Sequence, residues 1–118
     1  MREIKFRGKQ LDNGEWVHGD IWQHNGKVDI VYKSEGYPVD PETVGQYTGK
    51  NDVEGNELYD GDITIDEFGR KSLIYWDDKL ARFVFQEHKK KTKYYLAIEH
   101  LKVMKIGNRW DNPELLGG

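Results

Sequence analysis

Residues 16–32 read WVHGDIWQHNGKVDIVY, and this stretch decides the fold class of the 118-residue chain. Within it stands Asn25-Gly26, a pair that accepts the positive φ angles of a type I′ turn. Strand-like residues flank the pair on both sides, and after it Val28, Ile30 and Tyr32 recur at every second position. This combination predicts a β-hairpin.

A second turn of the same kind extends the hairpin toward the N-terminus. Asn13-Gly14 is also an Asn-Gly pair, and Ile4 and Phe6 alternate with charged residues before it. Two such turns between three strand-like stretches predict a three-stranded antiparallel meander within residues 1–33.

The remainder of the chain has the pattern of further short strands. Residues 34–61 carry glycines and prolines with little periodicity, so we expect connecting turns there, with only residues 44–48 extended. Residues 62–118 contain five short strand-like stretches separated by turns, a spacing typical of a small barrel. We therefore predict an all-β single domain over residues 1–118, in which 62–118 form an SH3-like barrel. Little or no helix is expected beyond one turn at 112–116.

The composition excludes several classes of protein. There is no cysteine, which rules out a disulfide framework, a thiol nucleophile and a cysteine-ligated metal. Lys and Arg number 18 against 21 Asp and Glu, a formal charge of −3, which argues against a general affinity for nucleic-acid phosphates. No apolar run approaches the roughly 20 residues that span a bilayer, and the N-terminus lacks a signal-peptide pattern. We therefore predict no membrane association and a cytoplasmic location.

Three segments of the chain resemble the YopX family of small proteins encoded by bacteriophages and prophages. They are residues 1–17, with MREIKFRGK and NGEWV; residues 39–63, with VDPETVGQYTG and ELYDGDI; and residues 106–116, with IGN and NPELL. Their order and spacing match over nearly the whole chain. The resemblance implies a β-rich fold with a C-terminal SH3-like barrel, a phage or prophage origin and the cytoplasm of a bacterial host cell. It supplies no catalytic residues.

The most suggestive cluster of chemistry-bearing residues is His18-Gly19-Asp20. Residues two apart on a strand project from one face, so His18 and Asp20 could bind one metal ion with a third ligand from His88 or His100. The alternative is that both face solvent or an interface, since two tryptophans share their face. A chain this short also has little room for a metal, a cosubstrate and a substrate. We therefore predict no metal and no other cofactor.

Paired carboxylates and hydroxyls give no better candidate for catalysis. Asp60-Gly61-Asp62 and Asp77-Asp78 each lie in an expected turn, where Asp serves for hydrogen bonds to the local backbone. Ser34 and Ser72 have no nucleophile elbow around them, and the chain has no Gly-rich phosphate loop. We therefore predict that the protein is not an enzyme.

A basic segment is the best candidate for nucleic-acid binding. Lys89, Lys90, Lys91 and Lys93 place four lysines in five positions, and Tyr94 follows where it could stack on an exposed base. The alternative is an ordinary solvated turn between two strands, because acidic residues flank the segment.

Aromatic residues in the meander indicate an interface. A three-stranded meander is not stable alone and must cover one face against something. That partner is either the rest of the chain or the meander of a second copy, because aromatics are enriched at interfaces and open strand edges invite pairing. We predict an oligomer interface at Trp16, Trp22 and Tyr32. The function that follows is a non-enzymatic homo-oligomeric binding or adaptor protein acting on a host or phage protein; the alternative is a nucleic-acid-binding accessory protein.

Overall fold

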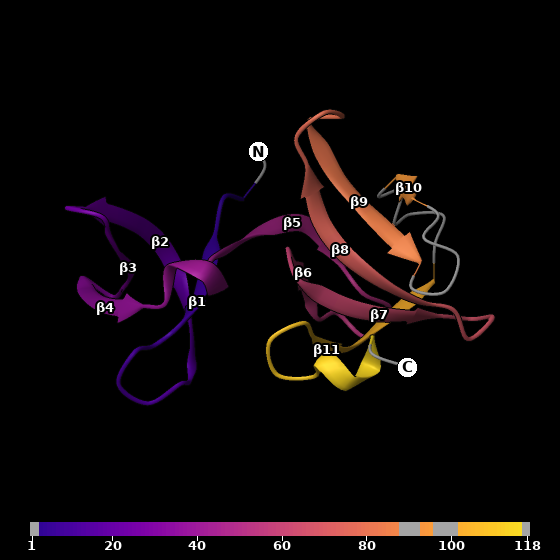
Figure 1. The fold of residues 1–118 in the computed structure, drawn as a ribbon, viewed down its shortest axis with the longest axis horizontal. Coiled ribbons are helices and arrows are strands. Elements are labelled where there is room, and N and C mark those ends of the chain that lie inside the picture. The colour runs from indigo at the N-terminus through magenta and orange to yellow at the C-terminus, as the bar shows by residue number, and fades with distance from the viewer. Residues whose placement is uncertain (1–2, 88–92, 96–101, 117–118) are drawn as a thin grey trace. The chain divides into compact units, whose positions relative to one another are not determined.

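Two units make up the chain, Met1–Tyr47 and Thr48–Gly118, in a computed structural model that describes residues 3–87, 93–95 and 102–116. Figure 1 shows the strands of both units. Within the described residues the secondary structure consists of β-strands and two short 3-10 helices, which confirms the predicted all-β class with little helix. No helix in that part of the chain is long and apolar enough to cross a membrane.

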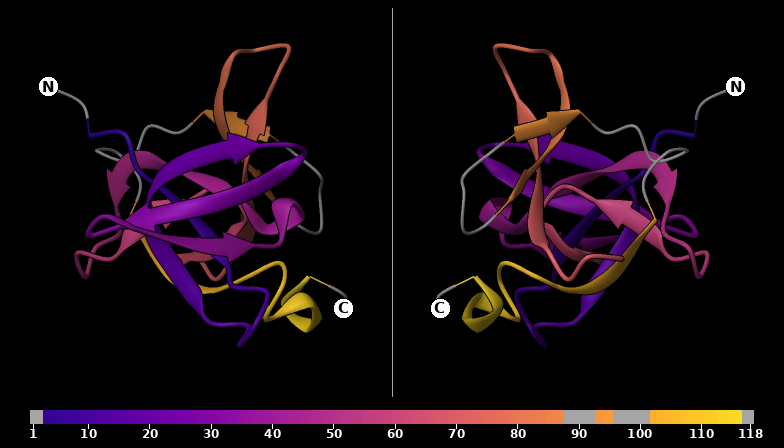
Figure 2. Two further views of the ribbon diagram at one scale, coloured as in Figure 1. Left: turned by 90° about the vertical axis from the view of Figure 1, so that its left-hand side faces the viewer. Right: turned by 90° about the vertical axis from the view of Figure 1, so that its right-hand side faces the viewer.

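The N-terminal unit is built on an antiparallel meander, seen in the left panel of Figure 2. Its elements are β1 (Phe6–Lys9), β2 (Trp16–His24), β3 (Lys27–Tyr32), β4 (Glu35–Val39), the 3-10 helix η1 (Pro41–Thr43) and the first residues of β5 (Gly45–Asn51). The strands pair in the order β4-β3-β2-β1-β5, and β5 continues this sheet to β6 (Glu57–Tyr59). The predicted meander is therefore present, and it contains a fourth strand.

Strand β2 changes neighbours along its length. Its first four residues pair with β1 up to Phe6↔Gly19, and its last five, from Asp20 on, pair with β3. Gly19 stands at the change, where a Cβ atom would lie 2.1 Å from the carbonyl oxygen of Val31. Only a residue without a side chain permits this approach, so glycine is required where β2 leaves β1.

The inner face of this sheet carries a small hydrophobic core. Val17, Ile30 and Val39 are buried there. Partly buried side chains pack against them, namely Phe6, Val28, Tyr37 and Val44. A Cβ atom on Gly8 would lie 2.9 Å from the Cβ of Val39, so the close approach of β1 and β4 also depends on a missing side chain.

The edge strand β4 is partly closed to pairing with another chain. Gln10 forms a bridge with Val39, and Leu11 donates its N–H to the carbonyl oxygen of Pro38 at 3.0 Å. Pro38 itself has no N–H to offer. Because proline and an occupied carbonyl both remove hydrogen-bonding groups from an edge, β4 presents little of a template for another strand.

The C-terminal unit holds a five-stranded antiparallel sheet. Its strands are β7 (Asp62–Asp66), β8 (Lys71–Asp77), β9 (Arg82–Glu87), β10 (Lys93–Tyr95) and β11 (Val103–Asn108), in the order β10-β9-β8-β7-β11. The β8–β9 hairpin projects from the sheet in the right panel of Figure 2. A buried cluster forms its core, namely Leu58, Ile74, Phe83, Phe85 and Val103. The helical turn predicted at residues 112–116 is confirmed as η3 (Pro113–Leu115).

The predicted SH3-like closure of this sheet is not confirmed. A barrel requires its two edge strands to pair, whereas β10 and β11 are the two ends of the sheet and no pairing joins them within the described residues. The segment 96–101, which holds parts of two predicted strands, lies outside those residues. The structure therefore supports an open five-stranded sheet.

Residues 34–61 differ from the sequence prediction of connecting turns, because they carry three strands. The extended segment predicted at 44–48 is confirmed as part of β5, but the sequence pattern does not predict β4 and β6. Strand β4 contains Gly36 and Pro38, and β6 is three residues long. Both depend on pairing with a neighbouring strand, which a local pattern of side chains does not reveal.

One carboxylate joins the connection after β5 to the last strand of the sheet. Asp52 is 7 % exposed, and its Oδ1 accepts the backbone N–H groups of Glu54 at 2.9 Å and Asn56 at 2.8 Å. Its Oδ2 accepts the Asn56 amide at 3.1 Å and the N–H of Lys105 in β11 at 2.9 Å. Burial raises the pKa of the Asp52 carboxyl, but these donors outweigh burial and hold the pKa below its ordinary value.

Candidate interaction site on the N-terminal sheet

One face of β2 carries its aromatic and ionisable side chains. Side chains alternate along a strand, and Val17 lies in the core, so the even-numbered residues face the opposite side. They are Trp16, His18, Asp20, Trp22 and His24. Trp22 is 53 % exposed, which places a large aromatic surface in solvent on this face.

The β2–β3 turn fixes the end of this face. Asn25 and Gly26 have φ angles of 48° and 74°, the type I′ geometry predicted from the sequence. The turn sets the register His24↔Lys27, which brings Asp29 opposite Trp22. In this register, His24 contacts Asp29 across the two strands and Trp22 along β2.

His24 connects the two strands at this end. Its Nε2 lies 3.3 Å from Oδ1 of Asp29 on β3. Its ring also stacks on Trp22, with the ring centroids 4.0 Å apart and the planes inclined by 29°. These contacts hold the indole and the imidazole together on the exposed face, so the pair is a preorganised surface feature.

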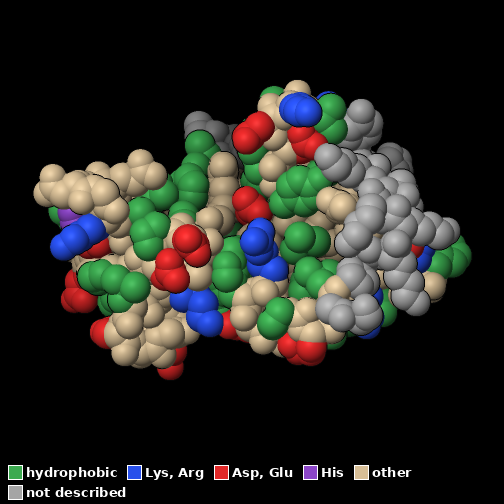
Figure 3. Space-filling view, in the orientation of Figure 1, with side chains coloured by type: hydrophobic (Ala, Val, Ile, Leu, Met, Phe, Trp, Pro, Cys, Tyr) green, Lys and Arg blue, Asp and Glu red, His purple; other side chains and the backbone are tan. Residues whose placement is uncertain are grey.

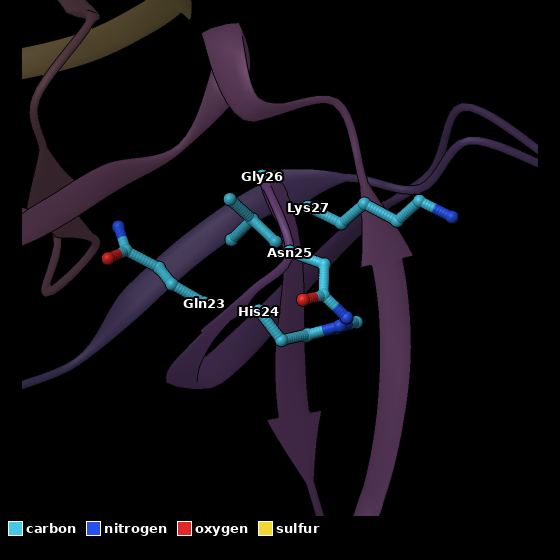
Figure 4. Close-up of a pocket in the computed structure, with 6 residues that line it drawn as sticks. Gln23, His24, Asn25, Gly26 and Lys27 are labelled. Carbon is cyan, nitrogen blue, oxygen red and sulfur yellow. The ribbon is translucent and has the colours of Figure 1, made fainter.

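A shallow hollow lies at the same end of the hairpin. It is lined by the consecutive residues 23–28, all from the turn and the ends of its two strands. Figure 4 shows Gln23 pointing to the opposite side of the hairpin from His24 and Lys27. A site for a small molecule normally has walls from several elements, so a hollow built by one hairpin is better suited to contact with another macromolecule.

Cations cover the other tryptophan of this face. The guanidinium of Arg7 lies 4.5 Å from the ring centroid of Trp16, and Nζ of Lys9 lies 5.8 Å from it. Arg7 is only 4 % exposed, so its charge is held against the indole. Lys5 makes the same kind of contact with Tyr47, at 5.5 Å.

The three residues of the predicted interface do not form one surface. Trp16 and Trp22 share the outer face of β2, but Tyr32 follows the alternation of Ile30, whose side chain enters the core. Tyr32 is 47 % exposed at the end of β3, with Nζ of Lys33 5.3 Å from its ring. Trp22 is therefore the member of the set that offers the most surface on the shared face.

The residues considered as metal ligands are His18 and Asp20, with His88 or His100 as a third ligand. His18 and Asp20 lie on one exposed face of β2, as their spacing predicts, but His88 and His100 are outside the described residues. The described ranges contain no group of three or more His, Cys, Asp or Glu placed to hold a metal ion.

One carboxylate of each predicted pair, Asp62 and Asp77, holds a turn, as predicted. Oδ2 of Asp62 accepts the Tyr59 N–H at 2.7 Å. Oδ1 of Asp77 accepts the N–H groups of Lys79 and Leu80 at 2.9 and 3.1 Å.

The predicted nucleic-acid segment falls largely outside the structure. Lys89, Lys90 and Lys91 lie outside the described residues. Lys93 and Tyr94 are part of β10, of which the structure describes the backbone. This segment stays a prediction from the sequence.

Two features of the site were missed from the sequence. The sequence analysis does not identify Asp29, although the two-residue turn at Asn25-Gly26 gives the register that places it opposite Trp22. The change of neighbours within β2 was also missed, and the signal available for it was Gly19 in the middle of a strand-like run.

The fold and this face define an all-β protein of two antiparallel sheets, the first of which presents an exposed aromatic and charged strand. The model of the YopX protein family matches residues 3–117, and the chain therefore belongs to the YopX family. The fold is similar to the crystal structure of protein EF1440 from Enterococcus faecalis, with a TM-score of 0.60 and 19 % sequence identity over 98 % of this chain and 99 % of that one. No curated protein sequence matches the chain.

Proposed function

We propose that this YopX-family protein is a non-enzymatic binding or adaptor protein that assembles as a homo-oligomer through its N-terminal unit. Its partner is a host or phage protein, and its place of action is the cytoplasm of a bacterial cell that carries the phage or prophage. The observation that carries this proposal is the exposed Trp22, stacked on His24 on the outer face of β2. Aromatic residues held rigidly in solvent are enriched at protein interfaces.

The character of the surface supports a macromolecular partner. The face combines Trp22 with His24, Asp29 and the cations over Trp16, so hydrophobic and charged groups alternate over a short distance. Figure 3 shows hydrophobic side chains interspersed with charged and polar ones over the visible face of the N-terminal unit. Mixed surfaces of this kind are typical of non-obligate protein interfaces, which are about as apolar as the rest of a protein surface.

Light scattering after size-exclusion chromatography tests the proposal, with absorbance recorded at 260 and 280 nm. We expect a nucleic-acid-free oligomer that Trp22→Ser shifts toward monomer. The matched control is Phe68→Ser, which removes an aromatic residue that is also exposed but lies in the C-terminal unit. A wild-type protein that stays monomeric at all concentrations tested would contradict the proposal.

The second candidate function is a nucleic-acid-binding accessory protein. One observation favours it, the four lysines at Lys89, Lys90, Lys91 and Lys93 immediately before Tyr94. A positive segment next to aromatic residues is a common way to bind single strands. Replacing the four lysines by serine is then expected to abolish retention on single-stranded nucleic acid at low salt, whereas unchanged retention would reject this candidate.

A further inference from the structure

Strand β2 has an open edge over its second half. Strand β1 pairs with β2 only up to Phe6↔Gly19, and the described residues contain no strand beside Asp20–His24 on that side. Figure 1 shows the β2–β3 hairpin extending past β1. An open edge presents backbone groups that serve as a template for another strand.

The backbone groups of Ile21 and Gln23 face this open edge. Gln10 donates its N–H to the carbonyl oxygen of Glu15 at 2.9 Å, so odd-numbered residues on this side of the meander direct their backbone groups toward β1. The two-residue turn after His24 requires the same alternation, because the residues that flank such a turn bond to each other across the hairpin. Two N–H and two C=O groups therefore point outward.

We propose that this edge binds the same edge of a second copy of the chain, with the two β2 strands antiparallel and centred on Trp22. The proposal rests on the proposed function, self-assembly through the N-terminal unit, and supplies its geometry. Ile21 of each copy pairs with Gln23 of the other, which makes four backbone hydrogen bonds. The two Trp22 residues lie opposite each other at the position of an antiparallel pair where side chains come closest.

The residues around Trp22 are complementary to themselves in this arrangement. Asp20 and His24 stand two residues before and two residues after Trp22. Antiparallel pairing about Trp22 therefore places Asp20 of each copy opposite His24 of the other, an acid facing a base twice over. Opposite-charge and aromatic cross-strand pairs stabilise a sheet, whereas like charges in the same positions destabilise it.

Symmetry makes a second copy the occupant that this edge fits. A two-fold interface uses one patch twice, so each favourable pair is formed two times. The contacts of His24 with Trp22 and Asp29 hold its ring on the face where the partner strand presents Asp20. An unrelated peptide would need its own acid, aromatic and base at matching positions.

The β2 edge also lacks two residue types that protect other edges. Residues 20–24 contain no proline and no lysine, the residues that usually block edge pairing. Strand β4 of the same sheet has Pro38, whose carbonyl already accepts the Leu11 N–H. Pairing through β2 therefore leaves each copy's native hydrogen bonds in place and extends the order to β4-β3-β2-β2-β3-β4 across the two copies.

Substitution of Gln23 tests the pairing. Gln23→Pro removes an outward N–H in each copy, hence two of the four bonds, and breaks no bond within the chain, since proline is tolerated on an open edge. We expect the dimer dissociation constant, measured by sedimentation or light scattering, to rise at least about tenfold. Gln23→Thr keeps the N–H and is expected to change the constant by less than about twofold.

Cross-linking provides a second measurement, independent of any loss of folding. The wild type has no cysteine, so single cysteines report one geometry each. Trp22→Cys places two sulfurs across a strand pair whose Cα atoms are roughly 4.5 Å apart, within disulfide range. Asp20→Cys places them four residues apart along the strands, about 13 Å, which is beyond that range. We expect a disulfide-linked dimer from the first variant and none from the second.

The outcomes separate the two proposals. A wild type that stays monomeric at all concentrations tested overturns both the proposed oligomer and the strand pairing. An oligomer that Gln23→Pro leaves intact, or that cross-links equally through both cysteines, retains the proposed function and overturns the pairing through β2.

Discussion

Replacing Asp52 by asparagine exchanges one of its two carboxylate oxygens for an NH2 group. In the wild type this carboxylate joins two distant segments of the C-terminal unit. The new amide keeps an oxygen for the N–H groups of Glu54 and Asn56, which now bind Oδ1. Its NH2 group takes the place of Oδ2, which accepts the N–H of Lys105 at 2.9 Å. In the variant, the NH2 group of the new asparagine therefore faces the N–H of Lys105, and two donors cannot form a hydrogen bond.

The expected cost follows from the bond that is lost. A hydrogen bond to a charged acceptor contributes about 1.5–3 kcal/mol, and the Asn56 side chain can turn to solvent while the Lys105 N–H cannot leave its strand. We therefore expect Asp52→Asn to lower the free energy of unfolding of the C-terminal unit by about 2–3 kcal/mol.

Asp66→Asn is the matched control, because Asp66 makes the same turn without a distant partner. Its Oδ1 accepts the N–H groups of Phe68 and Arg70, and its Oδ2 accepts Nε of Arg70 at 2.7 Å. The Arg70 side chain is 42 % exposed, and exposed ion pairs contribute only about 0.2–1 kcal/mol. The control variant is therefore expected to lose less than about 1 kcal/mol.

Native-state hydrogen exchange of the β11 amides measures this difference. Exchange at individual amides reports the C-terminal unit by itself, whereas a single denaturation curve averages two units. Equal losses in the two variants would refute the reasoning, because they would mean that the bond from Lys105 to Asp52 contributes nothing beyond the local turn.

Two further predictions concern pH and strand geometry. The pKa values of Asp52 and Asp66 are lower in the folded protein than their ordinary value of 3.8. Their contribution to stability is therefore complete above that value and is lost as the pH falls through the lower, folded pKa. We expect the melting temperature to drop below about pH 4, and to drop less steeply in Asp52→Asn than in the wild type, whereas equal slopes would contradict this. Gly19→Ala forces a Cβ atom against the carbonyl of Val31 and is expected to cost about 3 kcal/mol, measured like its control by native-state hydrogen exchange within its own unit. Gly55→Ala, at a φ of +86° with open space around it, is expected to cost only about 1 kcal/mol, and a reversed order would reject the steric explanation.

The strands that could be predicted from the sequence are those determined by nearby residues, through the turn type and the alternation of side chains. Asn25-Gly26 determines a turn type, and the turn determines a register, so the β2–β3 hairpin follows from a few residues. Residues 62–66 match β7 because Ile63 and Ile65 alternate with polar residues between two turns. In both places the side-chain period and the turn chemistry agree.

The rest depends on pairing between segments that lie far apart in the sequence. Strand β4 contains Pro38, and it pairs with β3 and is bridged by Gln10. The residues of β4 itself carry no signal for either contact. The same limit applies to the candidate site, since Trp22 could be selected as an exposed aromatic but the open edge beside it depends on where β1 begins. Sheet edges are properties of topology, and an isolated stretch of sequence carries no signal for them.

The position of β11 beside β7 has a consequence for synthesis on the ribosome. The strands of the N-terminal meander pair with their neighbours in sequence, so they can assemble as the nascent chain emerges. One edge of β7, in contrast, stays unpaired until β11 has been synthesised, and β11 begins only at Val103. Strand β11 also carries the Lys105 N–H that donates a hydrogen bond to Asp52. The C-terminal unit therefore spends most of its translation with one strand edge uncovered, and this interval is where aggregation or capture by a chaperone competes with folding.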